Sequence, residues 1–298
     1  SYCGVFGFKP SSAVNRFEDM SKAWGGAVVS HVTTRSVRDS AAYLDMTTGR
    51  VAPDASSHAS KPIEGSYLAG LYLPPRTLKI GLITESPLGT LVAEDCVNAA
   101  KDAATLCQSL GHQVEATRWN FDGKLLMRAF LTILLYYTHR DITMISASLG
   151  ISVKELDIET GTRFIAMAGS GVTPERLSWA EMVLQDTRQK MADCYKNYDL
   201  ILTPAVGSEL QTGDAVEPKG LEKWVLQFLI RSGLASKVVG NRALDQAVIQ
   251  NLKMAPFTAI ANATGQPAMS VPLYWNERNL PYGAHFMAAK GQDALLLS

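Results

Sequence analysis

The stretch Leu78-Lys79-Ile80-Gly81-Leu82-Ile83-Thr84 decides the fold class of this chain. Its short apolar run is typical of a buried strand. An apolar stripe at helical spacing follows it, and residues 112–116 then return as a second strand after Gly111, a natural helix end. Strand, helix and strand at these lengths predict a βαβ unit with parallel strands, and therefore an α/β fold. The helical stripe consists of Cys96, Ala99, Ala100, Ala103, Leu106, Cys107 and Leu110.

A looser version of the pattern follows downstream. Thr173 is a candidate helix cap, and Pro174 occupies the first helical position, where its missing N–H costs nothing. The helix predicted from there leads into an apolar strand at 199–204 that ends at a proline. Residues 121–149 are predicted to be helical and partly buried. Late strands are expected at 269–273 and 283–287.

Other segments carry capping or loop signals. Ser36-Val37-Arg38-Asp39 matches a capping box, and the helix that it starts is expected to end at Gly49. Residues 51–77 contain four prolines and several serines, which predicts a connecting loop with little regular structure. Residues 207–220 are also loop-like, and 224–230 is predicted to be a short helix.

Composition excludes several function classes. The 298 residues carry a formal net charge of +0, which argues against a nucleic-acid footprint or a polybasic membrane surface. The longest apolar run, residues 130–137, is far shorter than the ~20 residues that span a bilayer. Cys3, Cys96, Cys107 and Cys194 are scattered and suggest neither a disulfide scaffold nor a zinc site, so a reducing cytoplasm is the expected location. Because the chain starts with Ser1, it is expected to be processed, truncated or incompletely recorded.

The known catalytic motifs are mostly missing from the sequence. The nucleophile elbow GxSxG is absent, and Gly169-Ser170-Gly171 lacks its spacing and is interpreted as a flexible turn. The glycines of 4–11 have the wrong spacing for a phosphate loop. The histidines show no metal-ligand spacing; His112 and His285 are interpreted as structural, and His139 is the hardest to dismiss. The residues alone therefore indicate a large α/β domain, most simply an enzyme.

Several stretches, in order, resemble landmarks of the amidase signature family. The resemblance covers nearly the whole chain and is weakest at 207–255; its character is nearest to the nylon-oligomer and aryl-acylamide branch. One departure lies at 13–16, where the family continues with glycine, arginine and a β-branched residue. The matching stretches are Tyr2-Cys3-Gly4-Val5-Phe6-Gly7-Phe8-Lys9-Pro10, Thr34 to Ala41, Asp199 to Ala205, Pro256-Phe257-Thr258, Ala263 to Pro272, Leu280 to Gly283 and Asp293 to Leu297.

The resemblance implies the amidase-signature α/β fold, with a mixed central sheet covered by helices on both faces. Residues 1–298 would form the C-terminal portion of a single such domain, without its catalytic N-terminal third and its C-terminal tail. Family members use a Ser–cis-Ser–Lys triad, and all three residues would lie upstream of Ser1. Lys9 matches a later Lys-Pro position with a structural role. The 298 residues alone are therefore expected to be inactive, and insoluble or molten.

The resemblance also suggests which residues would line a substrate pocket. Thr203, Pro204 and Ala205 lie at the C-terminal end of a strand, where ligands bind in α/β sheets. Tyr136, Tyr137 and His139 are a second candidate set, because aromatic residues in a variable helical segment can line a pocket. Ordinary core packing, or contact between two copies in a homodimer, explains each set equally well.

The function implied is hydrolysis of a small non-peptide carboxamide through an acyl-serine intermediate. No metal and no organic cofactor are expected, and neither nucleic acid nor membrane is an expected partner. One alternative is the ammonia-generating glutaminase component of a tRNA-dependent amidotransferase. Another is a non-catalytic fragment or pseudoenzyme that acts as a binding or scaffold protein.

Overall fold

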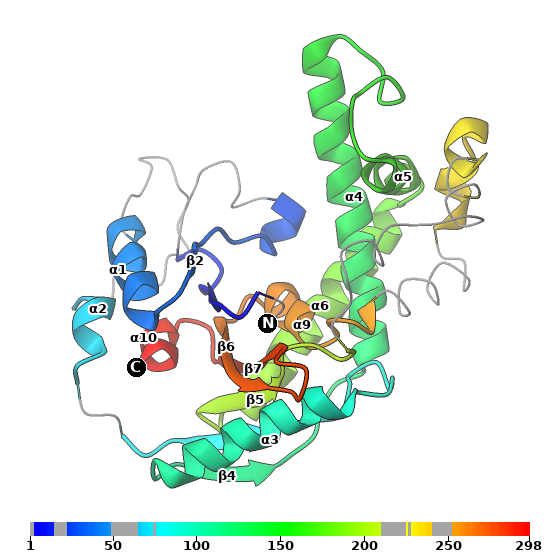
Figure 1. Cartoon of the computed structure of the whole chain (residues 1–298). Coiled ribbons are helices and arrows are strands. Elements are labelled where there is room, and N and C mark those ends of the chain that lie inside the picture. Colours follow the sequence, from blue (N-terminus) through cyan, green and yellow to red (C-terminus); the bar gives the residue numbers. More distant parts are fainter. Residues whose placement is uncertain are drawn as a thin grey trace. The chain divides into compact units, whose positions relative to one another are not determined.

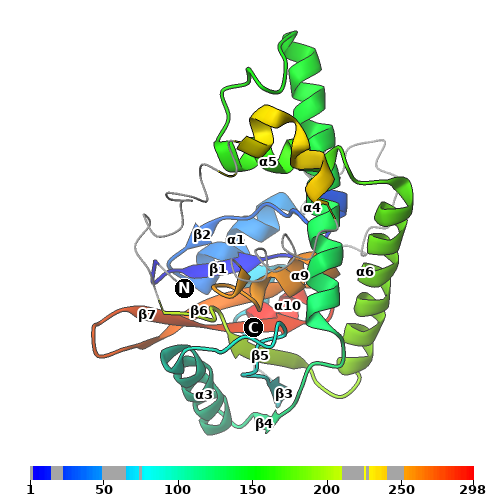
Figure 2. The same cartoon turned by 90° about the vertical axis from the view of Figure 1, so that its right-hand side faces the viewer.

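A computed structural model gives the structure of the chain, and Figures 1 and 2 show it from two directions. Its described residues are 3–14, 23–48, 65–73, 76–209, 225, 228–239 and 252–298. They divide into two compact units, each of which is described by itself. Unit 1 comprises Ser1–Gly123, Asp186–Leu210 and Leu252–Ser298, and unit 2 comprises Lys124–Gln185 and Gln211–Asn251.

Unit 1 is built on a mixed sheet, which has seven strands within the described ranges. The strands are β1 (Phe6–Lys9), β2 (Thr33–Thr34), β3 (Lys79–Leu82), β4 (Gln113–Ala116), β5 (Leu200–Pro204), β6 (Ala268–Trp275) and β7 (Pro281–Ala288). Their order across the sheet is β2-β1-β6-β7-β5-β3-β4. Strand β3 is parallel to β4 and β5, and the other neighbours are antiparallel.

Helices of unit 1 connect and cover these strands (Figure 1). They include η1 (Ala23–Gly26), α1 (Val37–Thr47), α2 (Tyr67–Gly70), α3 (Glu94–Ser109), α9 (Thr258–Thr264), α10 (Asp293–Leu297) and the C-terminal part of α6 (Pro174–Cys194). The predicted βαβ unit is confirmed as β3-α3-β4. Gly111 lies just after α3 with φ of +91°, a backbone conformation that glycine adopts without strain.

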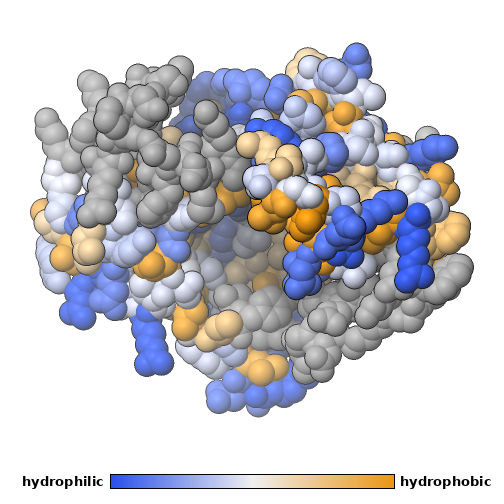
Figure 3. Space-filling view, turned by 90° about the horizontal axis from the view of Figure 1, so that it is seen from above, coloured by the Kyte–Doolittle hydropathy of each residue, from blue (hydrophilic) through white to orange (hydrophobic). Residues whose placement is uncertain are grey.

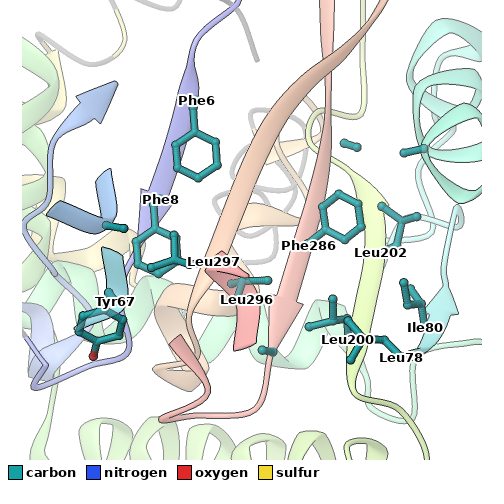
Figure 4. Close-up of a cluster of buried hydrophobic side chains, with 14 of the residues drawn as sticks. Phe6, Phe8, Tyr67, Leu78, Ile80, Leu200, Leu202, Phe286, Leu296 and Leu297 are labelled. Atoms are coloured by element: carbon teal, nitrogen blue, oxygen red, sulfur yellow. The ribbon is translucent and has the colours of Figure 1, made fainter. Parts of the chain in front are cut away.

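Alternate strand residues carry the main hydrophobic core, as the two-residue period of a strand requires. Phe6, Phe8, Leu200, Leu202 and Phe286 point to one side of the sheet, which we call the first face (Figure 4). Helices α1, α2, α3 and α10 contribute buried residues to the same cluster. Each fully buried side chain of this size stabilises the fold by about 1.5–3 kcal/mol. The helical members include Ala41, Leu44, Tyr67, Ala103, Leu296 and Leu297.

The opposite side of the sheet, which we call the second face, is covered as well. Ile201 lies between Leu200 and Leu202 in β5, and Met287 follows Phe286 in β7; both are fully buried. Because neighbouring residues of one strand point to opposite faces, the centre of the sheet is buried on both sides. The predicted mixed sheet with two covered faces is confirmed.

Unit 2 is helical within its described residues. It contains α4 (Gly123–Leu149) from Lys124 onward, α5 (Thr160–Gly169), the first part of α6 and the short helix η3 (Leu234–Val238). The predicted long helix and the Thr173 cap are confirmed, since Thr173 Oγ1 accepts a 3.3 Å hydrogen bond from the amide of Arg176. A small core holds the unit together; its buried members are Leu135, Phe164, Ala168, Ile230 and Ala235.

Several expectations are corrected or fall outside the described residues. Leu106 and Leu110 are 44% and 68% exposed, because burial along α3 ends at Ala104 while the apolar period continues. Part of the expected loop at 51–77 is helix α2; the carboxylate of Asp45 in α1 accepts hydrogen bonds from its first amides, a long-range contact. Gly49, residues 51–64 and 74–75, residues 210–220, and residues 224, 226 and 227 of the expected helix at 224–230 lie outside the described residues.

Gly169-Ser170-Gly171 is a turn that also lets backbone segments approach closely. A Cβ atom at Gly169 would lie 2.0 Å from the carbonyl oxygen of Leu135, and one at Gly171 would lie 2.1 Å from that of Ser236. The predicted turn is present, with the amide of Val172 donating to the carbonyl of Gly169 at 3.1 Å, and the two glycines are also sites of close backbone approach inside unit 2.

Candidate functional site

A row of small and polar residues crosses the second face at four adjacent central strands. Gly7 in β1 pairs with Ser270 in β6, Ser270 pairs with His285 in β7, and His285 pairs with Thr203 in β5. Directly paired residues point to the same face, so these four positions form one continuous line. We call it the polar row. Its neighbours along the strands are mostly apolar, which makes three polar side chains at the centre of the sheet an exception that needs a reason.

Hydrogen bonds fix the state of the inner half of the polar row. Thr203 Oγ1 donates its single proton to the carbonyl oxygen of Pro204 at 3.0 Å. The 3.0 Å contact between Thr203 Oγ1 and His285 Nδ1 must then be donated by the imidazole N–H. A neutral ring protonated at Nδ1 carries its lone pair on Nε2. His285 therefore offers a hydrogen-bond acceptor on the second face.

Electrostatics keep this imidazole neutral. His285 is 3% exposed, and its burial lowers its pKa from 6.5 to about 4, with the positive charge of Lys9 acting in the same direction. At neutral pH the ring is uncharged, so the tautomer set by Thr203 is the state that any ligand would meet.

In the part of the chain that the structure describes, the outer half of the polar row has an unsatisfied hydroxyl and free space at Gly7. Ser270 Oγ is buried, yet it has no hydrogen-bond partner among the described residues. Beside it, a Cβ added to Gly7 would meet no atom of the described chain within 4 Å. A glycine inside a strand often marks a place where a ligand or another backbone approaches closely. The polar row thus combines an acceptor, a free hydroxyl and an unfilled space.

A second buried polar cluster joins the segment after β1 to α10. Asp293 is fully buried and accepts hydrogen bonds from Ser11 N at 2.7 Å and from Ser11 Oγ at 2.5 Å. The amide of Gly291 in turn donates to Ser11 Oγ at 2.8 Å. Burial raises the pKa of Asp293, and the Ser11 hydrogen bonds oppose that rise. This arrangement holds two chain segments together.

Lys9 lies near this cluster. Its Nζ donates to the carbonyl oxygen of Pro10 at 2.8 Å, and burial lowers its pKa to about 8, against the opposing effect of Asp293. A bond to a backbone carbonyl fits the structural role that was expected of Lys9.

The first set of predicted pocket residues lies in and after β5. Thr203 and Pro204 are the last two strand residues, and Ala205 follows, with its amide donating to the carbonyl of Gly283 at 3.1 Å. All three are buried. Thr203 contacts His285 in the polar row, and a substrate contact for Thr203, Pro204 and Ala205 stays a prediction.

The second set lies on α4 in unit 2. Tyr136 and Tyr137 meet edge to face with ring centroids 5.3 Å apart, and the Arg140 guanidinium lies 4.5 Å from the centroid of Tyr137. Burial raises the pKa of the Tyr137 hydroxyl. His139 Nδ1 donates to the carbonyl of Ala166 at 2.9 Å, which ties α4 to α5. These three residues lie in unit 2 and the β5 set lies in unit 1. The pocket role of both sets stays a prediction.

Sequence reasoning missed Ser270 and assigned His285 only a structural role. The available signal was a polar residue in the middle of each of three apolar strands, at 203, 270 and 285. The sequence does not reveal the strand register that aligns these three residues.

Unit 1 also has a cavity of about 430 Å³ away from the polar row. Two of its polar side chains are already engaged, because Arg76 binds Asp199 and His112 Nδ1 accepts from the amide of Leu78. The third, Ser298, donates its Oγ–H to the carbonyl of Leu295. The lining consists of Gly70, Leu73, Arg76, Leu78, His112, Ala294, Leu295 and Ser298.

Within the described residues, the structure has neither a cluster of metal-binding side chains nor a membrane-spanning helix. Among the described residues, no group of three or more His, Cys, Asp or Glu side chains is placed to hold a metal ion. None of the helices in the described part of the chain has the length and apolar character to cross a membrane. On the face shown in Figure 3, hydrophobic and hydrophilic side chains are interspersed.

The class of protein follows from comparison with known families. The family model described as Amidase matches residues 1–297, so the chain belongs to the amidase signature family of hydrolases. Its curated relatives include the 6-aminohexanoate-cyclic-dimer hydrolases of Pseudomonas sp. (strain NK87) and Paenarthrobacter ureafaciens, each 27% identical over 306 residues. The match covers 100% of this chain and 58% of each relative, so the chain spans somewhat more than half their length.

Solved structures agree. A 6-aminohexanoate cyclic dimer hydrolase in complex with its substrate superposes with a TM-score of 0.81 at 25% identity, over 100% of this chain and 59% of that one. A bacterial aryl acylamidase of the amidase signature family superposes with a TM-score of 0.72 at 18% identity, over 99% of this chain and 57% of that one, which shows the common fold. The predicted family and fold are confirmed.

Proposed function

We propose that this protein hydrolyses a non-peptide carboxamide through an acyl-serine intermediate, with its Ser–cis-Ser–Lys triad outside residues 1–298. One observation carries the proposal: the chain matches, along its whole length, relatives that bear the name 6-aminohexanoate-cyclic-dimer hydrolase, and it belongs to the amidase signature family. Acyl transfer needs an activated nucleophile and oxyanion donors, and their loss costs orders of magnitude in rate. Residues 1–298 alone should therefore show no turnover.

The reaction proposed uses only protein groups. The triad lysine, acting through the bridging serine, takes the proton of the nucleophilic serine, which attacks the amide carbonyl. The amine leaves with a proton, and water then releases the acid from the acyl-serine. Residues of the present chain would bind and orient the substrate.

The test is an assay of the complete gene product on the 6-aminohexanoate cyclic dimer and on a small anilide. We expect mass spectrometry to detect ring-opened amide and released aniline, at rates that EDTA does not change. A polypeptide limited to residues 1–298 is the matched control and should be inactive. Loss of activity with a chelator and its recovery with zinc would contradict the proposed mechanism, and turnover by the control would contradict the placement of the triad.

The amidotransferase alternative has weaker support. A solved glutamyl-tRNA(Gln) amidotransferase component from Thermotoga maritima superposes with a TM-score of 0.61 at 20% identity, a likeness of fold alone. Glutaminase activity that requires a partner protein would favour this alternative, and amide hydrolysis without a partner would favour the hydrolase. A protein that binds amides without cleaving them would be the non-catalytic alternative.

Location and assembly belong to the same proposal. The cysteines within the described residues are all free thiols, which supports a reducing cytoplasm. A homodimer stays a prediction, and light scattering of the complete protein would test it.

A further inference from the structure

The outer half of the polar row has the features of a small binding site. Gly7 forms its floor, because the missing side chain leaves space on the second face. Ser270 supplies a hydroxyl that the described chain leaves without a partner, and His285 supplies the lone pair of Nε2. A buried hydroxyl without a partner is unfavourable, so a ligand that satisfies it gains binding free energy.

The donors and acceptors define which ligand fits. Ser270 Oγ–H can donate to a carbonyl oxygen, and His285 Nε2 can accept from an N–H group. A carboxamide presents that pair of groups and carries no charge. A carboxylate has no N–H to offer to Nε2, and an ammonium group has no acceptor for the Ser270 hydroxyl.

We propose that Gly7, Ser270 and His285 form a carboxamide-binding subsite, in which Ser270 donates to the carbonyl of the substrate, His285 accepts from its N–H, and Thr203 is the positioning residue that fixes the His285 tautomer. The identity of the ligand as substrate rests on the proposed function. The low pKa of His285 supports the subsite, since a protonated ring would have no lone pair to offer.

The first experiment fills the space. Gly7→Ala in the complete protein adds a methyl group that meets nothing in the described chain, so it should change Tm by less than about 2 °C and yet raise KM for the cleaved amide by about 10-fold. Gly161→Ala is the matched control, because a Cβ at Gly161 also meets no atom within 4 Å and Gly161 belongs to α5 of unit 2, outside the polar row. It should leave KM unchanged.

The second experiment separates the two hydrogen bonds. Hexanamide and methyl hexanoate serve as competing ligands, since the ester keeps the carbonyl and lacks the N–H. Ser270→Ala should weaken both by about 5-fold, the loss expected for one neutral hydrogen bond. His285→Leu should weaken hexanamide alone, and His285→Gln, which keeps a neutral acceptor, should restore most of the difference.

Each outcome decides a separate point. If the wild-type protein cleaves no amide while calorimetry still detects hexanamide binding that Gly7→Ala weakens, the proposed function fails and the subsite holds. If amides are cleaved and none of the variants changes KM or the amide-to-ester ratio, the subsite is wrong. A fall in Tm of more than about 5 °C in Gly7→Ala, but not in Gly161→Ala, would mean that polypeptide backbone fills the space, and that would also overturn the proposal.

Discussion

At the scale of single residues, the Ser11–Asp293 pair links two distant parts of the chain through buried hydrogen bonds. Ser11→Ala removes the Oγ that binds Asp293 and also the acceptor of the Gly291 amide. Leaving these buried groups unsatisfied should cost about 2 kcal/mol of unfolding free energy. Urea denaturation measures the loss. Ser12→Ala is the control, because Ser12 Oγ makes one 3.3 Å contact and is partly exposed, so its loss should stay below about 1 kcal/mol.

Single residues also mark the limit of prediction from sequence. The caps at Ser36 and Thr173 could be predicted, since the amides that they bind lie three residues away; Ser36 Oγ accepts from Asp39 N at 3.1 Å. The polar row could not be predicted, because its members lie far apart in sequence. Apart from Ser270 and His285, every pair is separated by more than 60 residues. Their alignment depends on strand register, because a one-residue slip would turn the side chains of a strand to the opposite face of the sheet.

At the scale of elements, two glycines of the same helix should respond in opposite ways to alanine. In α5, Gly161 has open space where a Cβ would go, and a Cβ at Gly169 would lie 2.0 Å from the Leu135 carbonyl oxygen. Gly161→Ala should stabilise the protein by about 0.5 kcal/mol through helix propensity. Gly169→Ala should destabilise it by about 2–3 kcal/mol, because α4 must move away. Thermal unfolding of both variants checks the sign; equal effects would contradict the contact.

The elements themselves were mostly predictable. Strands β3, β5, β6 and β7 and helices α3, α4 and α6 match apolar periods that are local in sequence. The exposure of Leu106 and Leu110 could not be predicted, because periodicity shows which side of a helix is apolar but not where along its length the covering residues end. Helix α2 was missed because Asp45, a residue of another helix, stabilises its first turn.

At the scale of the whole molecule, buried neutral imidazoles make stability depend on pH. Burial lowers the pKa of His285 and of His31 to about 4. Between about pH 4 and 6.5 the unfolded chain binds protons at these rings and the folded protein does not, so unfolding free energy rises with pH across this window. The full effect of His285 is on the order of 3 kcal/mol. Urea unfolding at pH 4.5 and 6.5 measures the slope, which His285→Gln should flatten; an unchanged slope would contradict the neutral ring.

The strand order was the least predictable property of the molecule. The parallel pair of β3 and β4 follows from the βαβ pattern, yet nothing in the local sequence places β6 and β7 between β1 and β5. Those pairings join residues more than 75 positions apart, such as Leu202 with Phe286, and they are selected by the total burial of the first face.

The chain leaves unit 1 twice and returns both times, at 124–185 and at 211–251, with β5 between the two excursions. Each segment is thus an insertion between strands of the sheet of unit 1. Over evolutionary time such segments can lengthen, shorten or be replaced without any change in strand order. Descendants of a common ancestor should therefore diverge fastest in these two segments, and new substrate ranges can arise there while the sheet is inherited almost unaltered.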